Sequence, residues 1–124
     1  MSIRNKEHKV FSKDQTVDSI KIISSVIKDF DNFDGKKGTR NTIKKIIIEN
    51  YSLNVKSFKV PHLINRIAYS FFRKSKANRS FEYAKILISN GINTPKPIAY
   101  FEYSNFNFLN KTFYISNQLD YDIT

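Results

Sequence analysis

Apolar residues follow a helical spacing in the first third of the chain and a strand-like spacing after it. From Thr16 to Phe30 they recur every three or four positions, which is typical of an amphipathic helix. The polar segment 31–41 contains two glycines and predicts a turn. Two runs come next, the β-branched 42–48 and the mixed 53–58, separated by a short polar reversal. These two runs predict a β-hairpin.

The second half of the chain predicts further helices and then strands. The segment 62–90 has no glycine or proline and carries two apolar stripes at helical spacing, which the basic stretch 73–80 separates. Ser80 or Asn78 is expected to cap the second helix, and Gly91 to end it. The last two expected strands are 98–103 and 111–119, joined by a loop at 104–110.

The order of these elements predicts the fold class. One helix, a turn, two or three strands, two helices and two strands give an α+β fold, with an antiparallel sheet of about five strands and the helices on one side. Residues 1–15 are polar and are expected to be loosely ordered. Asp14 or Thr16 is expected to cap the first helix.

Composition excludes several classes of function. The chain has 124 residues, no cysteine and two histidines, so it has no disulfide framework, thiolate zinc site or cysteine nucleophile. Apolar runs such as Ile46–Ile48 are at most four residues long, and the N-terminal residues lack the apolar stretch of a signal peptide. We therefore expect a soluble protein of a reducing compartment.

The charge of the chain is concentrated in its middle. Of the net charge of +10, residues 50–101 contribute +8, from nine basic side chains and the single acidic Glu82. Such an excess favours polyanionic partners: nucleic acid, nucleotides, phospholipid or lipopolysaccharide. A solvated basic face without any partner is the alternative interpretation.

Three features carry candidate chemistry. Gly35 and Gly38, with two lysines between them, could let the backbone approach a phosphate, although an ordinary hairpin turn has the same composition. Lys56 lies within an expected strand, where its ammonium needs an anionic partner unless it faces solvent. Glu82 is the sole carboxylate between Glu49 and Glu102.

Glu82 has two possible kinds of partner in this pattern. It is the one candidate in this region for an ion pair with Lys56, and it also lies three positions from Arg79 and from Lys85. A strand lysine, a following helix glutamate and two further strands are the parts of a protein-kinase-like N-lobe. Lys56 close to Glu82 would favour this interpretation, and Lys56 directed to solvent would count against it.

Three longer stretches resemble the lipopolysaccharide kinase (Kdo/WaaP) family. They are 55–61, 72–84 and 91–100, and their most specific part is RSFEYA followed by GINTPKPIAY. The resemblance covers roughly residues 33–124. It implies a kinase-like N-lobe in 33–124 with a C-type helix, preceded by an N-terminal extension, 1–32, that carries the additional amphipathic helix.

The resemblance also implies an activity and a set of site residues. The family phosphorylates a Kdo or heptose sugar of the lipopolysaccharide inner core with ATP, so the acceptor is an anionic glycolipid. The expected location is cytoplasmic, at the surface of the inner membrane. Lys56 would hold the nucleotide phosphates and Glu82 would orient it, while Gly35 and Gly38 would lie in the turn that covers the phosphates. The residues expected to border the adenine are Ser116, Asn117, Gln118 and Leu119.

The chain departs from the family after the expected hinge. It contains no HRD-like catalytic loop and no DFG-like metal motif, which in such kinases belong to the C-lobe. We therefore expect an N-lobe that ends near the hinge, that does not transfer phosphate alone, and that uses Mg²⁺ only together with a C-lobe.

Two other functions remain open from the sequence. One is a non-enzymatic basic module that binds anionic lipid or nucleic acid, although the lack of any RNP, KH or zinc-finger signature disfavours nucleic acid. The other is a degenerate, pseudokinase-like scaffold.

Overall fold

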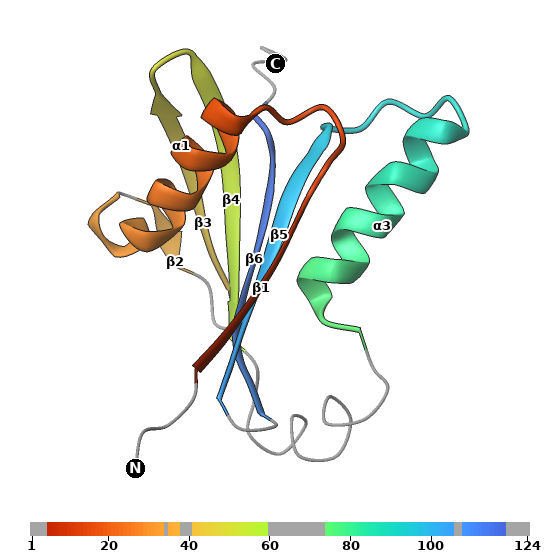
Figure 1. Ribbon diagram of the computed structural model, residues 1–124. Coiled ribbons are helices and arrows are strands. Elements are labelled where there is room, and N and C mark those ends of the chain that lie inside the picture. The colour runs from red at the N-terminus through yellow and green to blue at the C-terminus, as the bar shows by residue number, and fades with distance from the viewer. Residues whose placement is uncertain (1–4, 34, 38–40, 60–73, 106–107, 119–124) are drawn as a thin grey trace.

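The computed structural model describes residues 5–33, 35–37, 41–59, 74–105 and 108–118 (Figure 1). Within these residues one antiparallel sheet has the strand order β1-β5-β6-β4-β3-β2. Its strands are β1 (Asn5–Phe11), β2 (Lys36–Lys37), β3 (Asn41–Ile48), β4 (Tyr51–Lys59), β5 (Pro97–Asn105) and β6 (Phe108–Asn117). The helices are α1 (Val17–Lys28), the short 3-10 helix η1 (Phe30–Asn32) and α3 (Lys76–Ser89). The predicted α+β class with an antiparallel sheet is confirmed.

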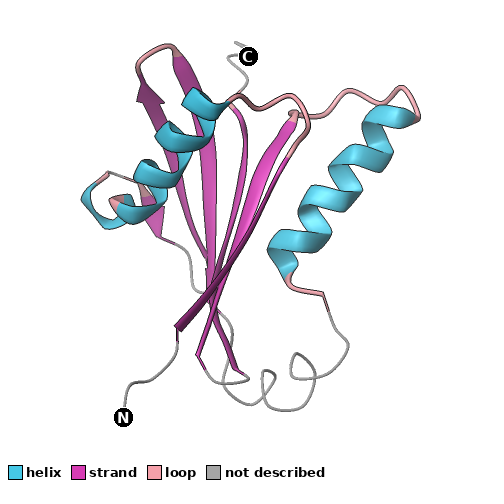
Figure 2. Cartoon of the chain, in the orientation of Figure 1, coloured by secondary structure: helices cyan, strands magenta, loops and turns pink. Residues whose placement is uncertain are grey.

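The two α-helices cover opposite faces of the sheet (Figure 2). Phe113 packs in the cluster that contains α1, whereas its neighbour Tyr114 contacts the cluster that contains α3. Because successive side chains of a strand point to opposite faces, the two helices lie on different sides. The expectation of helices on one side is wrong for α1 and α3. Element order alone does not specify the face on which an N-terminal helix packs.

The first strand is an element that the sequence pattern missed, as is the short strand β2 within the predicted turn 31–41. Residues 5–11 were expected to be loosely ordered, but they pair with β5 along their whole length, Glu7 opposite Tyr103. The Tyr103 hydroxyl donates a hydrogen bond of 2.6 Å to the Glu7 carboxylate. The strand lies at the edge of the sheet, where only Val10 and Phe11 pack against the cores, so it lacks the apolar alternation that identifies half-buried strands.

The predicted first helix is confirmed, including one of its two possible caps. Thr16 Oγ1 accepts a hydrogen bond from the Ser19 amide at 3.1 Å, and Ser19 Oγ accepts one from the Thr16 amide at 2.8 Å. This reciprocal pair is a capping box. The apolar stripe buries Ile23, Val26 and Ile27. They contribute to the larger core together with residues of the central strands, including Val55, Phe101, Phe113 and Ile115.

The helix α3 begins earlier than predicted. Its N-cap is Ser75, whose hydroxyl accepts a hydrogen bond of 3.0 Å from the Asn78 amide, so the assignment of the cap to Ser80 or Asn78 was wrong. The basic stretch 73–80 was expected to contain a break between two helices. Residues 74 and 75 lie outside a helix, whereas the rest of the described stretch forms the first turns of α3. Gly91, at a φ of 77°, follows the helix as predicted. The other helix expected within 62–90 falls on residues 60–73, outside the described part of the chain.

The strands are also longer than the sequence indicated. The loop expected at 104–110 is largely strand, because β5 continues to Asn105 and pairs there with Phe108. Serine and asparagine favour turns locally, but cross-strand pairing within a hairpin extends strands through them. In the described ranges, no helix is long and apolar enough to cross a membrane.

Candidate functional site

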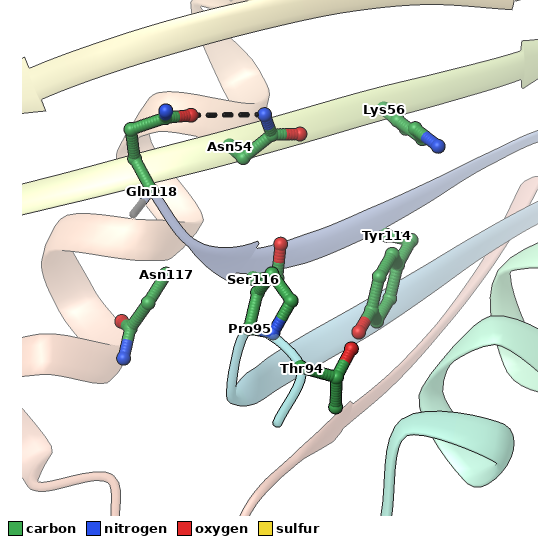
Figure 3. A pocket seen from close by; sticks show the side chains of 8 residues that line it. All are labelled: Asn54, Lys56, Thr94, Pro95, Tyr114, Ser116, Asn117 and Gln118. Atoms are coloured by element: carbon green, nitrogen blue, oxygen red, sulfur yellow. Dashed lines mark hydrogen bonds between the residues drawn. The ribbon is translucent and has the colours of Figure 1, made fainter. Parts of the chain in front are cut away.

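A pocket of about 520 Å³ lies where β4, β6 and the connection into β5 meet (Figure 3). This volume lies within the range of small-molecule sites, roughly 300–1,000 Å³. Apart from one proline, every side chain of its lining carries a polar group, and a single one of them is charged. The lining residues are Asn54, Lys56, Thr94, Pro95, Tyr114, Ser116, Asn117 and Gln118.

Lys56 is the one charged side chain of this lining. It lies near the middle of β4, between two strands, opposite Ile43 of β3 and Tyr114 of β6. Its strand neighbours Val55 and Ser57 are buried, and alternation along the strand turns Lys56 to the other face, where the pocket lies. Lys56 is half-buried. The pocket therefore has a positive charge on its wall.

Tyr114 is the strand partner of Lys56, and its hydroxyl lies beside Thr94 in Figure 3. Burial raises the pKa of Tyr114 to about 12, because removal from water disfavours the phenolate. The side chain is thus a neutral hydrogen-bonding group at physiological pH. The Thr94 side chain lies next to the Tyr114 ring in Figure 3. Two hydroxyls therefore line this part of the pocket.

The end of β6 closes the pocket on another side. The Gln118 amide donates to the Ser52 carbonyl at 2.9 Å, and the Asn54 amide group donates to Gln118 Oε1 at 3.0 Å. The Asn117 amide donates to the Lys96 carbonyl at 3.0 Å. These bonds fix β6 against β4 and against the connection that carries Thr94, so the wall is preorganised.

Four of the predicted site residues therefore line one pocket. Lys56 and the segment 116–118 are about sixty positions apart in the sequence, and the pairing of β4 with β6 brings them together. The sequence interpretation missed Asn54 and Tyr114. Asn54 lies two positions before Lys56 on the same strand, so alternation would have placed it on the same face; Tyr114 could be found only from the strand register.

Gly35 lies outside this pocket and packs closely on β3. A Cβ atom at this position would lie 2.3 Å from Lys44 Cγ and 2.7 Å from the Ile43 carbonyl oxygen. The glycine therefore permits a close approach of the turn to its own sheet. Gly38 and Leu119, the other predicted contacts of the nucleotide, fall outside the described residues.

Glu82 pairs with a neighbour on its own helix. Its carboxylate lies 3.7 Å from Lys85 Nζ, one of the two local partners that the sequence allowed. No ion pair joins Glu82 to Lys56, both of which the structure describes, so the contact that would have favoured the kinase-like interpretation is not formed. Glu82 instead lines a second cavity of about 510 Å³, between α3 and the end of β1.

The described residues contain no cluster of three or more histidine, cysteine, aspartate or glutamate side chains that could hold a metal ion. Hydrogen-bonding groups and one cation thus dominate the chemistry of the first pocket. No protein-family model, no curated protein and no solved structure matches this chain.

Proposed function

We propose that this chain is the nucleotide-binding lobe of an ATP-dependent phosphotransferase of the lipopolysaccharide kinase (Kdo/WaaP) type. One observation carries the proposal. Lys56 and the segment 116–118, which the resemblance assigns to phosphate and adenine contacts respectively, line the same pocket. The pairing of β4 with β6 joins them.

The chemistry of the pocket suits a nucleotide. Lys56 offers an ammonium to an anionic phosphate, a contact that in kinases belongs to a strand lysine. Ser116, Asn117 and Gln118 offer hydrogen-bonding groups at the other end, where a base would lie. The hairpin β3-β4, the helix α3 and the strands β5 and β6 follow in the order of a kinase-like N-lobe.

We further propose that the lobe does not transfer phosphate by itself. None of the eight lining residues is a carboxylate, so the pocket offers no carboxylate ligand for Mg²⁺ and no carboxylate to act as a general base. In protein kinases the strand lysine must also pair with the helix glutamate in the active arrangement. Glu82 is engaged by Lys85 here. Mg²⁺ and the catalytic base would have to come from a second lobe.

The proposed acceptor is an anionic glycolipid at the cytoplasmic surface of a membrane. The outer surface of α3 and its C-terminal turn supports contact with such a surface, since Tyr83 is 65% exposed, Ile86 53% and Ile92 52%, with the exposed Lys85 beside them. Apolar side chains mixed with lysines favour binding to anionic lipid. Tyr83→Ala should weaken co-sedimentation with phosphatidylglycerol vesicles; unchanged co-sedimentation would exclude α3 from this contact.

Isothermal titration with ATP tests the nucleotide site. A charge-assisted hydrogen bond contributes about 1.5–3 kcal/mol, so Lys56→Ala should raise the dissociation constant for ATP about 10- to 100-fold. The matched control is Lys59→Ala, which removes an exposed lysine from the end of the same strand, outside the pocket.

Equal weakening by both substitutions would contradict the proposal, because it would indicate attraction to general positive charge. A single-stranded oligonucleotide serves as the second ligand in the same titration. If it binds more tightly than ATP and depends equally on both lysines, the chain is better described as a basic binding module.

A further inference from the structure

The outer edge of β1 is open in the described part of the structure. β1 is the last strand of the sheet and pairs only with β5 there. The helix α3 packs over β5 and β6 rather than over this edge. An open edge presents a row of unpaired N–H and C=O groups that can pair with another strand.

The sequence of β1 is complementary to itself in one register. Along a strand, the N–H and C=O groups of every second residue point to the same edge. When two identical strands pair antiparallel about a two-fold axis, two opposed residues are therefore both odd-numbered or both even-numbered. The register that pairs all seven residues of β1 is centred on His8. It sets Glu7 of each copy opposite Lys9 of the other.

The neighbouring registers lack this complementarity. A shift to the next allowed register in one direction sets Glu7 opposite Glu7, and in the other direction Lys9 opposite Lys9. Like charges directly opposite each other destabilise a strand pair, and opposite charges stabilise it. The opposed charges of Glu7 and Lys9 and the number of paired residues therefore favour the same register, the one centred on His8.

The two charges are already arranged side by side within one chain. Lys9 Nζ lies 3.5 Å from Glu7 Oε1, and the two side chains are 40% and 37% exposed. The Tyr103 hydroxyl holds the Glu7 carboxylate in place. A second copy would complete a group of four charges that alternate in sign across the new strand pair.

We propose that two copies of this chain pair through β1, antiparallel and centred on His8, so that their two sheets become one continuous sheet. This inference is independent of the proposed nucleotide site. A contact made by one strand from each copy buries little area and is expected to be weak. The net charge of +10 on each copy also opposes association, so physiological salt is needed to screen it.

Sedimentation velocity of the full chain at concentrations up to ~1 mM tests the pairing. The unmodified protein should show a reversible dimer. Glu7→Lys and Lys9→Glu should each sediment as a monomer, because each sets like charges opposite each other. An equimolar mixture of the two variants should recover the dimer, since two acidic side chains of one chain then face two basic side chains of the other. A monomeric unmodified protein, or a mixture that stays monomeric, would overturn the proposal.

Cross-linking through a single introduced cysteine tests the register while Glu7 and Lys9 stay unchanged. The chain has no cysteine of its own, and opposed residues of an antiparallel pair have Cα atoms about 4.5–5.5 Å apart, within disulfide reach. His8→Cys should form a covalent dimer under a mild thiol oxidant. Val10→Cys is the control, because the cysteines of the two copies would be separated by about four residues along the strands, ~13 Å. Equal cross-linking of the two variants, or none in His8→Cys, would overturn the register.

Discussion

Phe81 anchors α3 to the sheet, and its truncation should be among the most damaging single changes in the described chain. The ring is 2% exposed and packs edge-on against Tyr100, with centroids 5.3 Å apart. Phe58 and Ala77 complete this smaller core, and Tyr114 of the pocket packs against it. Loss of the ring would leave a void between the helix and two strands.

The magnitude of the effect can be worked from the burial of the ring. Truncation of a buried phenylalanine to alanine costs about 3–5 kcal/mol, against a total stability of about 5–15 kcal/mol for a domain. At about 4 °C per kcal/mol, the melting temperature of Phe81→Ala should fall by about 12–20 °C. Tyr83→Ala is the matched control on the same helix, 65% exposed, and should change stability by at most about 0.5 kcal/mol.

Urea unfolding followed by circular dichroism measures both variants. A loss below about 1 kcal/mol in Phe81→Ala would refute the packing of α3 through this face. An equal loss in Tyr83→Ala would show that the opposite side of the helix is buried. The first result would also remove the support that this core gives to Tyr114.

Three further changes test separate features of the fold. Ser75→Ala removes the N-cap of α3 and should cost about 1 kcal/mol in the same urea assay, while Ser75→Gly, which adds neither bulk nor charge at this buried position, should retain most of the stability. Gly35→Ala should cost about 1–3 kcal/mol, because the new methyl group would collide with Lys44 Cγ and the Ile43 carbonyl oxygen; Gly91→Asn, where nothing lies within 4 Å and φ is positive, should be nearly neutral. The hydrogen bond from Tyr103 holds the pKa of Glu7 below its usual value of 4.5, so Glu7 stabilises the fold above that pH and this contribution is lost as the pH falls through its lower folded pKa. Tyr103→Phe should therefore flatten the loss of stability between neutral and acidic pH, and an unchanged pH dependence would contradict the role of this hydrogen bond.

The elements with strong periodicity were predictable, and those defined by tertiary pairing were not. The helix α1 and the hairpin β3-β4 bury regular apolar positions such as Ile23, Ile46 and Leu53, so their patterns were sufficient. The edge strand β1 buries too little to leave a pattern. Its existence depends on Tyr103 and the rest of β5, about ninety positions away.

The residues of the candidate site also fall into those that the sequence could reveal and those that it could not. Lys56 was identifiable because a lysine inside a strand is chemically conspicuous, and Ser116 because it lies before the expected hinge. The partner of Glu82 depended on how α3 packs, which the sequence does not specify; the neighbouring Lys85 satisfies the carboxylate locally. Asn54 and Tyr114 contribute through strand alternation and register, which are properties of the assembled sheet.

The most direct test of the central claim is to locate bound ATP on the protein by NMR. On titration with ATP, the backbone amide signals of Lys56, Tyr114 and Ser116–Gln118 should shift together, along a single saturable curve. The amide of Lys59, on the same strand but outside the pocket, should stay in place. Shifts spread over exposed lysines throughout the chain, with no saturation at Lys56 and Ser116–Gln118, would contradict a nucleotide site in this pocket.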